Sequence, residues 1–190
     1  MNRSIFRRYV WPFMQWFALM IFIAIIIDYF FHLYKITSVG RYLGYIGTGV
    51  IVLSFVYSLR KRQIIKVGSP KRLLMLHEYM AWAGSVMILV HAGIHFNALL
   101  PWLAVVMLLI AVASGLVGKF LLKRANQTYK EKLQYLVKDG MTKEEASRKL
   151  FYDTIMVDTM KKWRTIHLPI TIFVGLLALL HIVSVILFSR

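Results

Sequence analysis

The sequence predicts an all-α integral membrane protein with five membrane-spanning helices. Hydrophobic residues make up 59% of its 190 residues, and the mean hydropathy is +0.63, which is typical of a membrane protein. Five apolar stretches are long enough to cross the hydrocarbon layer as helices. Basic residues gather in alternate connections between these stretches, as they do in membrane proteins whose cytoplasmic loops are positively charged.

The five spans belong to a single membrane domain that covers residues 1–190. We expect them at about residues 10–33, 42–58, 73–96, 102–122 and 166–188. The second span carries Gly44, Gly47 and Gly49, and small residues there permit close approach of a neighbouring helix or of a flat cofactor.

The polar segment 123–164 is expected to form a cytoplasmic helical loop. A first helical pattern ends at Asp139-Gly140. A second helix is predicted to start at Thr142, because Glu145 three residues later completes a capping box. This second helix carries an apolar stripe, and the whole segment 123–164 is expected to lie on the lipid headgroups or to dock a partner. The stripe consists of Leu150, Phe151, Ile155 and Met156.

Loop charges predict a cytoplasmic N-terminus and an external C-terminus. The N-terminal tail carries three arginines, the loop before the third span carries six basic residues, and segment 123–164 carries eleven. The opposite side has only Lys35, Arg41 and Arg190. Because positive loops stay inside, we expect an integral protein of the bacterial cytoplasmic (inner) membrane.

The charge and the lack of cysteine exclude other classes of function. A net charge of +16 in a soluble protein would suggest nucleic acid as partner, but here the basic segments are short and tethered to a membrane, so we expect no nucleic-acid binding. The absence of cysteine excludes disulfides, zinc–thiolate sites and cysteine-ligated iron–sulfur clusters.

One histidine spacing occurs twice. His77 and His91 lie fourteen positions apart in the third span, and His167 and His181 share this separation in the fifth. Fourteen positions of α-helix leave two side chains about 40° apart on one face and about 21 Å apart in height. Both spans run from inside to outside, so His77 and His167 share the cytoplasmic level, and His91 and His181 share the outer level.

Two haem b groups explain this match. A histidine inside a membrane span costs a few kcal/mol unless it has a partner, and a low-spin haem iron takes one imidazole on each face of the macrocycle. The spacing therefore predicts an inner haem between His77 and His167, and an outer haem between His91 and His181. Gly84 lies midway between His77 and His91, and Gly175 lies between His167 and His181. Glycine at these positions would leave room for a porphyrin face, but glycine is also ordinary in membrane helices.

Haem propionates need cationic partners near the membrane surface. The candidates beside the inner histidines are Lys71, Arg72, Lys162 and Arg164, and those on the outer side are Lys35 and Arg41. Loop charge statistics of membrane proteins would explain each of them equally well.

Three further polar residues lie at the outer level: Asp28, His32 and His95. Asp28 and His32 are four positions apart and share a face of the first span. They are candidates, with His95, for a quinone or proton-exchange site, and Asp28 and His32 would otherwise form a structural pair with Arg41. His91 and His95 together with this pair would alternatively hold zinc or another ion.

The segments Leu76-His77-Glu78 and Val90-His91-Ala92, with Ile166-His167 and Leu180-His181 further on, resemble the ferric-reductase-like transmembrane superfamily. That group includes ferric reductases, the membrane part of NADPH oxidases and the haem subunit of a bacterial methionine sulfoxide reductase system. The resemblance covers about residues 73–188 and implies haem histidines on the third and fifth helices. The spacing is also similar to that in the cytochrome b subunit of quinol:cytochrome c oxidoreductases.

Two departures from the superfamily matter for function. The chain has no predicted sixth span, and it has no flavin- and nicotinamide-binding domain after the last span. We therefore do not expect a self-contained NAD(P)H reductase.

The function expected from these features is electron transfer across the bilayer by a di-haem b-type cytochrome. Such a chain would be a subunit of a respiratory or reductase complex that exchanges electrons with quinone or quinol, with membrane lipid and other redox subunits as its partners. Whether it is itself an enzyme stays open. The alternatives are a non-redox transporter or channel that uses the histidines to relay metal or protons, and a membrane anchor whose histidines only pack helices.

Overall fold

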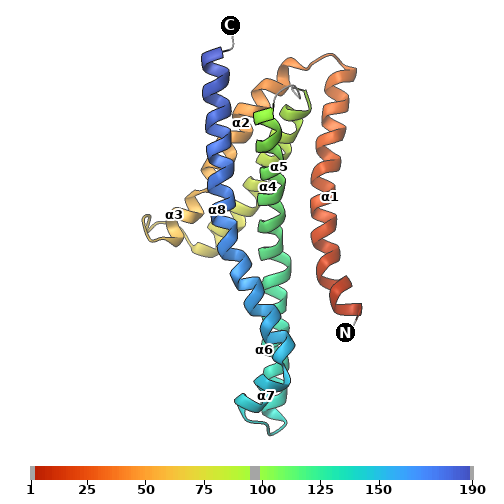
Figure 1. Ribbon diagram of the computed structural model, residues 1–190, viewed down its shortest axis with the longest axis vertical. Helices are drawn as coiled ribbons and strands as arrows, with labels where there is room; N and C mark the ends of the chain where they lie inside the picture. Colours follow the sequence, from red (N-terminus) through yellow and green to blue (C-terminus); the bar gives the residue numbers. More distant parts are fainter. Residues whose placement is uncertain (1–2, 95–98, 189–190) are drawn as a thin grey trace.

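The computed structural model describes residues 3–94 and 99–188, and this part of the chain is built from helices and short connections (Figure 1). Side chains are described for these residues except 3–10, 94, 121–126, 152–154, 156–161 and 163–164. The helices, in chain order, are α1 (Arg3–Leu33), α2 (Ser38–Ser54), α3 (Val56–Lys61), α4 (Pro70–Ile94), α5 (Leu99–Leu116), the π-helical turn η1 (Val117–Leu122), α6 (Lys123–Lys138), α7 (Lys143–Lys149) and α8 (Phe151–Phe188).

Five helical stretches are long and apolar enough to cross a membrane, which confirms the predicted number. They are Trp11–Leu33, Ser38–Lys61, Pro70–Gly93, Leu99–Phe120 and Thr165–Phe188. The second and third stretches begin before the predicted residues 42 and 73. For the third the reason is Pro70, which occupies the first helical position, where its missing N–H costs nothing.

Helix α4 lies at the centre of the packing. It contacts α1, α2 and α5, while α8 packs mainly on α5. α2 and α4 approach each other closely, since a Cβ added at Gly47 would lie 3.0 Å from the carbonyl oxygen of Gly84, and the reverse distance is also 3.0 Å. The predicted role of Gly47 in close helix approach is therefore confirmed, whereas Gly84 serves this same contact and does not leave room for a porphyrin face.

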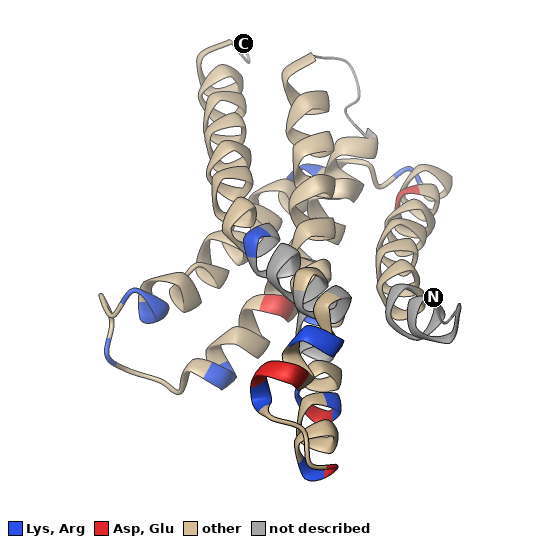
Figure 2. Cartoon of the chain, turned by 60° about the horizontal axis from the view of Figure 1, so that its bottom comes forward, with Lys and Arg blue, Asp and Glu red and all other residues tan. Residues whose placement is uncertain are grey.

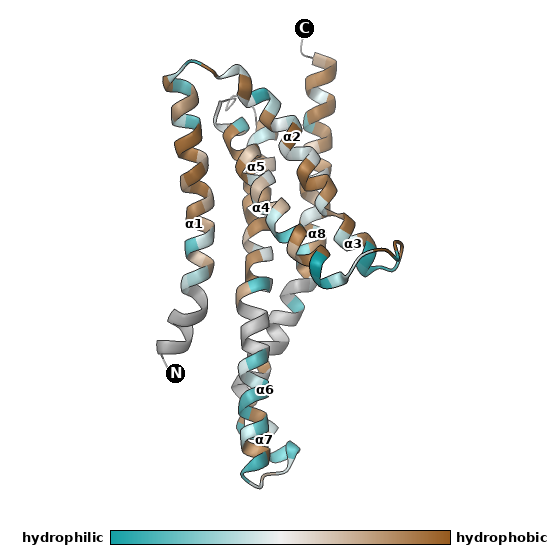
Figure 3. Ribbon diagram, turned by 180° about the vertical axis from the view of Figure 1, so that it is seen from behind, coloured by the Kyte–Doolittle hydropathy of each residue, from teal (hydrophilic) through white to brown (hydrophobic). Residues whose placement is uncertain are grey.

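The small core formed by α1 and α4 contrasts with a large apolar surface. Met20 and Ala24 of α1 and Val86 and Val90 of α4 are buried together. Many large apolar side chains on all five long helices remain exposed, and Figure 3 shows that hydrophobic residues occur along most of the length of these helices. Such a surface suits contact with lipid chains.

The end of the molecule opposite the C-terminus is a narrow helical projection. α5 continues through η1 into α6, and α8 begins at Phe151, so the extensions of two spans form an antiparallel pair closed by α7 (Figure 1). Figure 2 shows many of the described lysines and arginines on this projection and near α3.

The projection contains one confirmed and one wrong prediction. The capping box is confirmed, since Thr142 Oγ1 accepts from the Glu145 N–H and the Glu145 carboxylate accepts from the Thr142 N–H. The predicted second helix instead ends at Lys149, and Phe151 and Ile155 of its stripe belong to α8. The sequence from Phe151 to Leu168 contains no glycine or proline. Nothing therefore interrupts α8 before it enters the fifth span.

Candidate functional site

The two histidines of α4 are fixed by backbone carbonyls of α2. His77 Nδ1 lies 3.0 Å from the Ser54 carbonyl oxygen, and His91 Nδ1 lies 3.0 Å from that of Gly40. A carbonyl can only accept, so each Nδ1 must carry the proton and donate it. In the neutral ring Nε2 then keeps its lone pair, which is the arrangement of an imidazole prepared to bind a metal.

The two acceptors repeat the spacing of the two donors. Gly40 and Ser54 are fourteen positions apart on α2, as His77 and His91 are on α4. α2 and α4 are neighbouring helices that pack along their length, so the same hydrogen bond forms at two levels. The sequence alone did not indicate that α2 carries this second set of equally spaced groups.

Close packing on α2 also fixes the His91 ring. A Cβ added at Gly44 would lie 2.8 Å from His91 Cγ and Cδ2, closer than real contacts allow. The predicted role of the α2 glycines is therefore sharpened at Gly44, which makes room for the imidazole itself. Gly49 has nothing within 4 Å of an added Cβ, so it does not take part. At the inner level Tyr57 stacks on His77 with ring centroids 5.6 Å apart.

His167 of α8 is held by α5 in a similar way. Ser114 Oγ donates to the Ala111 carbonyl oxygen at 2.7 Å and is also in hydrogen-bond contact with His167 Nδ1. Because the hydroxyl proton is engaged, His167 Nδ1 must donate, and its Nε2 keeps the lone pair. Ser114 is buried. A serine inside a strongly apolar span was the sequence signal that could have identified it.

At the outer level, His91 and His181 face each other across α4 and α8. Their ring centroids are 6.4 Å apart and the ring planes are tilted by 53°. α4 and α8 are not among the pairs of helices in extensive close contact in the described part of the chain. The side chains therefore approach each other where the two backbones do not.

At the inner level, His77 is held from α2 and His167 is held from α5. A Cβ added at Gly115 would be in ordinary contact with His167 Cε1, at 3.5 Å. Gly175, between His167 and His181, has nothing within 4 Å of an added Cβ.

Beside the inner histidines is an ion pair that the sequence pattern did not predict. Lys119 Nζ in the π-helical turn η1 lies 2.9 Å from the Glu78 carboxylate, next in sequence to His77. The ammonium also lies over the rings of Tyr79, Phe120 and Trp16, at 5.3, 5.6 and 6.0 Å from their centroids. π-Helical turns often occur at functional sites, and a lysine within an apolar span was the available signal.

The predicted propionate partners lie at the helix ends. Lys71 and Arg72 are exposed in the first turn of α4, and Arg41 is exposed near the start of α2. The side chain of Arg164 lies outside the described residues. Lys71 and Arg72 thus lie on the inner side and Arg41 on the outer side, and no contact between them and the histidines is described.

Asp28 and His32 share a face of α1, as predicted. His32 Nδ1 lies 2.9 Å from the Asp28 carbonyl oxygen and 3.6 Å from its Oδ1. His95 lies outside the described residues. Among the residues that the structure describes, no group of three histidine and carboxylate side chains is placed to hold a metal ion.

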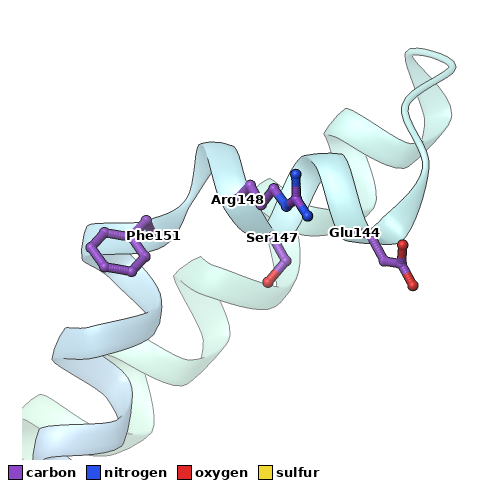
Figure 4. Close-up of a pocket in the computed structure, with 4 residues that line it drawn as sticks. All are labelled: Glu144, Ser147, Arg148 and Phe151. Atoms are coloured by element: carbon purple, nitrogen blue, oxygen red, sulfur yellow. The ribbon is translucent and has the colours of Figure 1, made fainter.

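A separate hollow lies on the projection, far from the histidines. Figure 4 shows its lining, in which Phe151 begins α8 and the other residues belong to α7. Its volume is about 320 Å³, and it is lined by Glu144, Ser147, Arg148 and Phe151. The lining combines one acid and one base without a metal-ligating or nucleophilic arrangement, so we assign it no chemistry.

Comparison of the chain with protein-family models, with curated proteins and with solved structures finds no match. The candidate site therefore depends on the arrangement of four histidines: three with Nδ1 engaged, and two whose rings face each other.

Proposed function

We propose that the chain is a membrane-bound di-haem b-type cytochrome that moves electrons across the bilayer as a subunit of a respiratory or reductase complex. The observation that carries the proposal is the facing of His91 and His181, with ring centroids 6.4 Å apart. Helices α4 and α8 bring these rings together without packing extensively on each other. Histidines that served only to pack helices would not need to meet in this way.

The outer pair fits a haem iron. A metal bound by two imidazoles on opposite sides, at about 2.0 Å from each nitrogen, sets the ring centroids about 6 Å apart. The Gly40 carbonyl oxygen holds His91 in the tautomer whose Nε2 is available. Gly44 supplies the space that this orientation needs.

The inner pair fits the same group. His77 and His167 both donate Nδ1–H to a neighbouring helix, to the Ser54 carbonyl and the Ser114 hydroxyl respectively. Such partners orient a ligating ring and raise its basicity. Lys119 neutralises Glu78 next to this site, which limits the net charge close to the inner group.

Haem supplies one-electron redox chemistry when it is bound, and the chain determines where that chemistry occurs. The histidine spacing on α4 sets the two sites about 21 Å apart along the helix. In the sequence, basic residues come shortly before each inner histidine, at the start of α4 and before the fifth span, which favours a cytoplasmic inner site and an external C-terminus.

The partners follow from the same arrangement. A chain that carries electrons through bound haem needs a donor and an acceptor. We propose quinol as the exchange partner within the membrane, and another redox subunit at the cytoplasmic side, where α6, α7 and the start of α8 offer a surface. The proposed location is the cytoplasmic membrane of a bacterium.

The test is a reduced-minus-oxidised absorption spectrum of the purified, haem-supplied protein, with pyridine haemochrome quantitation. We expect b-type bands and two haems per chain. One haem per chain would show that a single pair is used. Material that folds but has no b-type bands would exclude the proposal and leave the transporter and anchor hypotheses.

A further inference from the structure

A lateral cavity beside α1 contains a carboxylate oxygen that lacks a partner. Asp28 Oδ1 is buried and has no hydrogen-bond partner in the described part of the chain. It lies against a cavity of about 170 Å³ formed by α1, α4 and α5. The other lining residues are apolar: Ile21, Ala24, Ile25, Leu89, Gly93 and Leu109.

An isolated acceptor in an apolar cavity needs a donor. His32 does not supply it, because His32 Nδ1 donates to the Asp28 backbone carbonyl and lies 3.6 Å from Oδ1, beyond hydrogen-bond distance. α4 approaches closely here, since a Cβ added at Gly93 would lie 3.0 Å from Asp28 Cγ. Glycine at position 93 thus lets the carboxylate reach the cavity between the helices.

The cavity has the size and the access required for a ring from the lipid phase. An apolar cavity of about 150 Å³ accommodates benzene, so this one holds a single six-membered ring. Ile25, which lines it, is 61% exposed on the lipid-facing surface of α1. A ligand with an apolar tail can therefore enter sideways and leave its tail among the lipid chains.

The cavity lies one helix away from the outer histidine. Leu89 and Gly93 are each two positions from His91, about 200° around α4, so the cavity and His91 occupy opposite sides of the same helix at one level. The width of an α-helix with its side chains is about 10 Å. A ring in the cavity is thus close to the outer site but separated from it by protein.

We propose that this cavity binds the head group of a membrane quinol, with Asp28 Oδ1 accepting the hydrogen bond of one quinol hydroxyl. The proposal deepens the proposed function and depends on it for the electron acceptors. Oxidation of one quinol to quinone breaks two O–H bonds and releases two protons and two electrons. With both haems bound, each would accept one electron, and Asp28 and the exposed His32 would pass the two protons, one after the other, to the outer water.

The test uses the full chain, loaded with haem, in nanodiscs of synthetic lipid that contain no quinone. A photoreactive azidoquinone is added, and the labelled peptides are identified by mass spectrometry. In parallel, the rate of haem reduction by a short-chain quinol is followed at the b-type band. The labelling can be measured whether or not haem is bound. Reduction by dithionite shows whether haem is present, even if quinol does not reduce it.

We expect labelling within residues 21–28 and 89–93. Asp28→Leu should lower affinity for the quinol about tenfold or more, because leucine offers no acceptor and the quinol hydroxyl loses its hydrogen bond. Asp28→Asn keeps an acceptor and the shape, and should bind more tightly than the leucine variant but reduce haem more slowly than the wild type. Asp139→Asn, an exposed acid on the projection, is the matched control and should match the wild type.

Labelling elsewhere, or an Asp28→Leu variant that is labelled and reduced like the wild type, would overturn the quinol site. If dithionite reveals b-type haem but no quinol reduces it and no label enters the cavity, the site fails while the cytochrome stands. If the cavity is labelled but no haem is present, the site stands and the proposed function fails.

Discussion

His91 on α4 and His181 on α8 face each other with ring centroids 6.4 Å apart, although their helices are not in extensive contact. His91 is also fixed from behind, because its Nδ1 lies 3.0 Å from the Gly40 carbonyl oxygen. The ring is thus oriented by α2 and directed toward α8. This relationship leads to the first two predictions.

Replacing His91 with alanine should remove one haem and leave the other. The inner pair does not depend on His91, so pyridine haemochrome quantitation should fall from two haems per chain to one. His32→Ala is the control, because His32 is exposed and bonds to its own helix. A His91→Ala protein that retains two haems would contradict the assigned pair. His95→Ala should also retain both.

Gly44→Ala should weaken the outer site without removing a ligand. The new Cβ would lie 2.8 Å from His91 Cγ, so the ring must rotate away from its present orientation. We expect loss of the outer haem on dilution or prolonged purification, measured as haem per chain over time. Gly49→Ala on the same helix is the matched control, since its Cβ meets nothing within 4 Å. Equal haem retention in the two variants would show that the ring has space to adapt.

Ser114→Ala should affect the inner site alone. Without the hydroxyl, His167 Nδ1 loses its partner, and loss of such a partner lowers metal affinity by about 10–100-fold. A haem titration of the apoprotein should show one weakened site, and a potentiometric titration should show one shifted midpoint. Ser114→Thr keeps the hydroxyl and should restore both values toward the wild type. A weakened outer site instead would reverse the assigned levels.

Gly84→Ala should destabilise the protein through helix packing. The added Cβ would lie 3.0 Å from the Gly47 carbonyl oxygen and 2.7 Å from Ile51 Cγ1, and backbone cannot move aside as a flexible side chain can. Overpacking of this kind costs about 1–3 kcal/mol. The midpoint of thermal unfolding in detergent should fall, while Gly118→Ala, which meets nothing within 4 Å, should leave it unchanged.

The capping box of α7 should weaken at acid pH. Hydrogen bonds from the Thr142 backbone N–H and hydroxyl lower the pKa of the Glu145 carboxyl below its ordinary value of 4.5. A depressed pKa means that the carboxylate stabilises α7 fully above the unfolded value and loses this effect as pH falls through the lower folded value. Amide exchange in residues 143–149, corrected for intrinsic rates, should therefore rise below about pH 4.5.

Two variants test that interpretation. Glu145→Gln should remove the part of the pH dependence that belongs to this carboxyl. Glu144→Gln changes a neighbouring exposed acid outside the box and should keep that part. Identical pH profiles in the two variants would show that the capping carboxylate does not control the helix end.

The sequence by itself determined the class of the molecule. Five apolar stretches, the alternating loop charges and the capping box at Thr142 are local properties, because span length, charge and hydrogen bonding within one turn involve residues close in the chain. The equal spacing of His77 and His91 with His167 and His181 is also local, since the geometry of one helix sets it. For this reason the four candidate histidines follow from the order of residues along the chain alone.

The tertiary structure decided what surrounds those histidines. That Gly40 and Ser54 accept from α4, that Ser114 accepts from His167, and that Gly84 faces α2 depend on how helices distant in sequence rotate and pack. The break at Leu150, between α7 and α8, was also not evident from the sequence, because the residues after it continue as one helix into the fifth span. Lys119 pairs with Glu78 because η1 lies beside α4. Apart from that break, each of these features is a contact between separate helices. The sequence pattern of one helix shows which residues share a face, but it does not specify which other helix that face will contact.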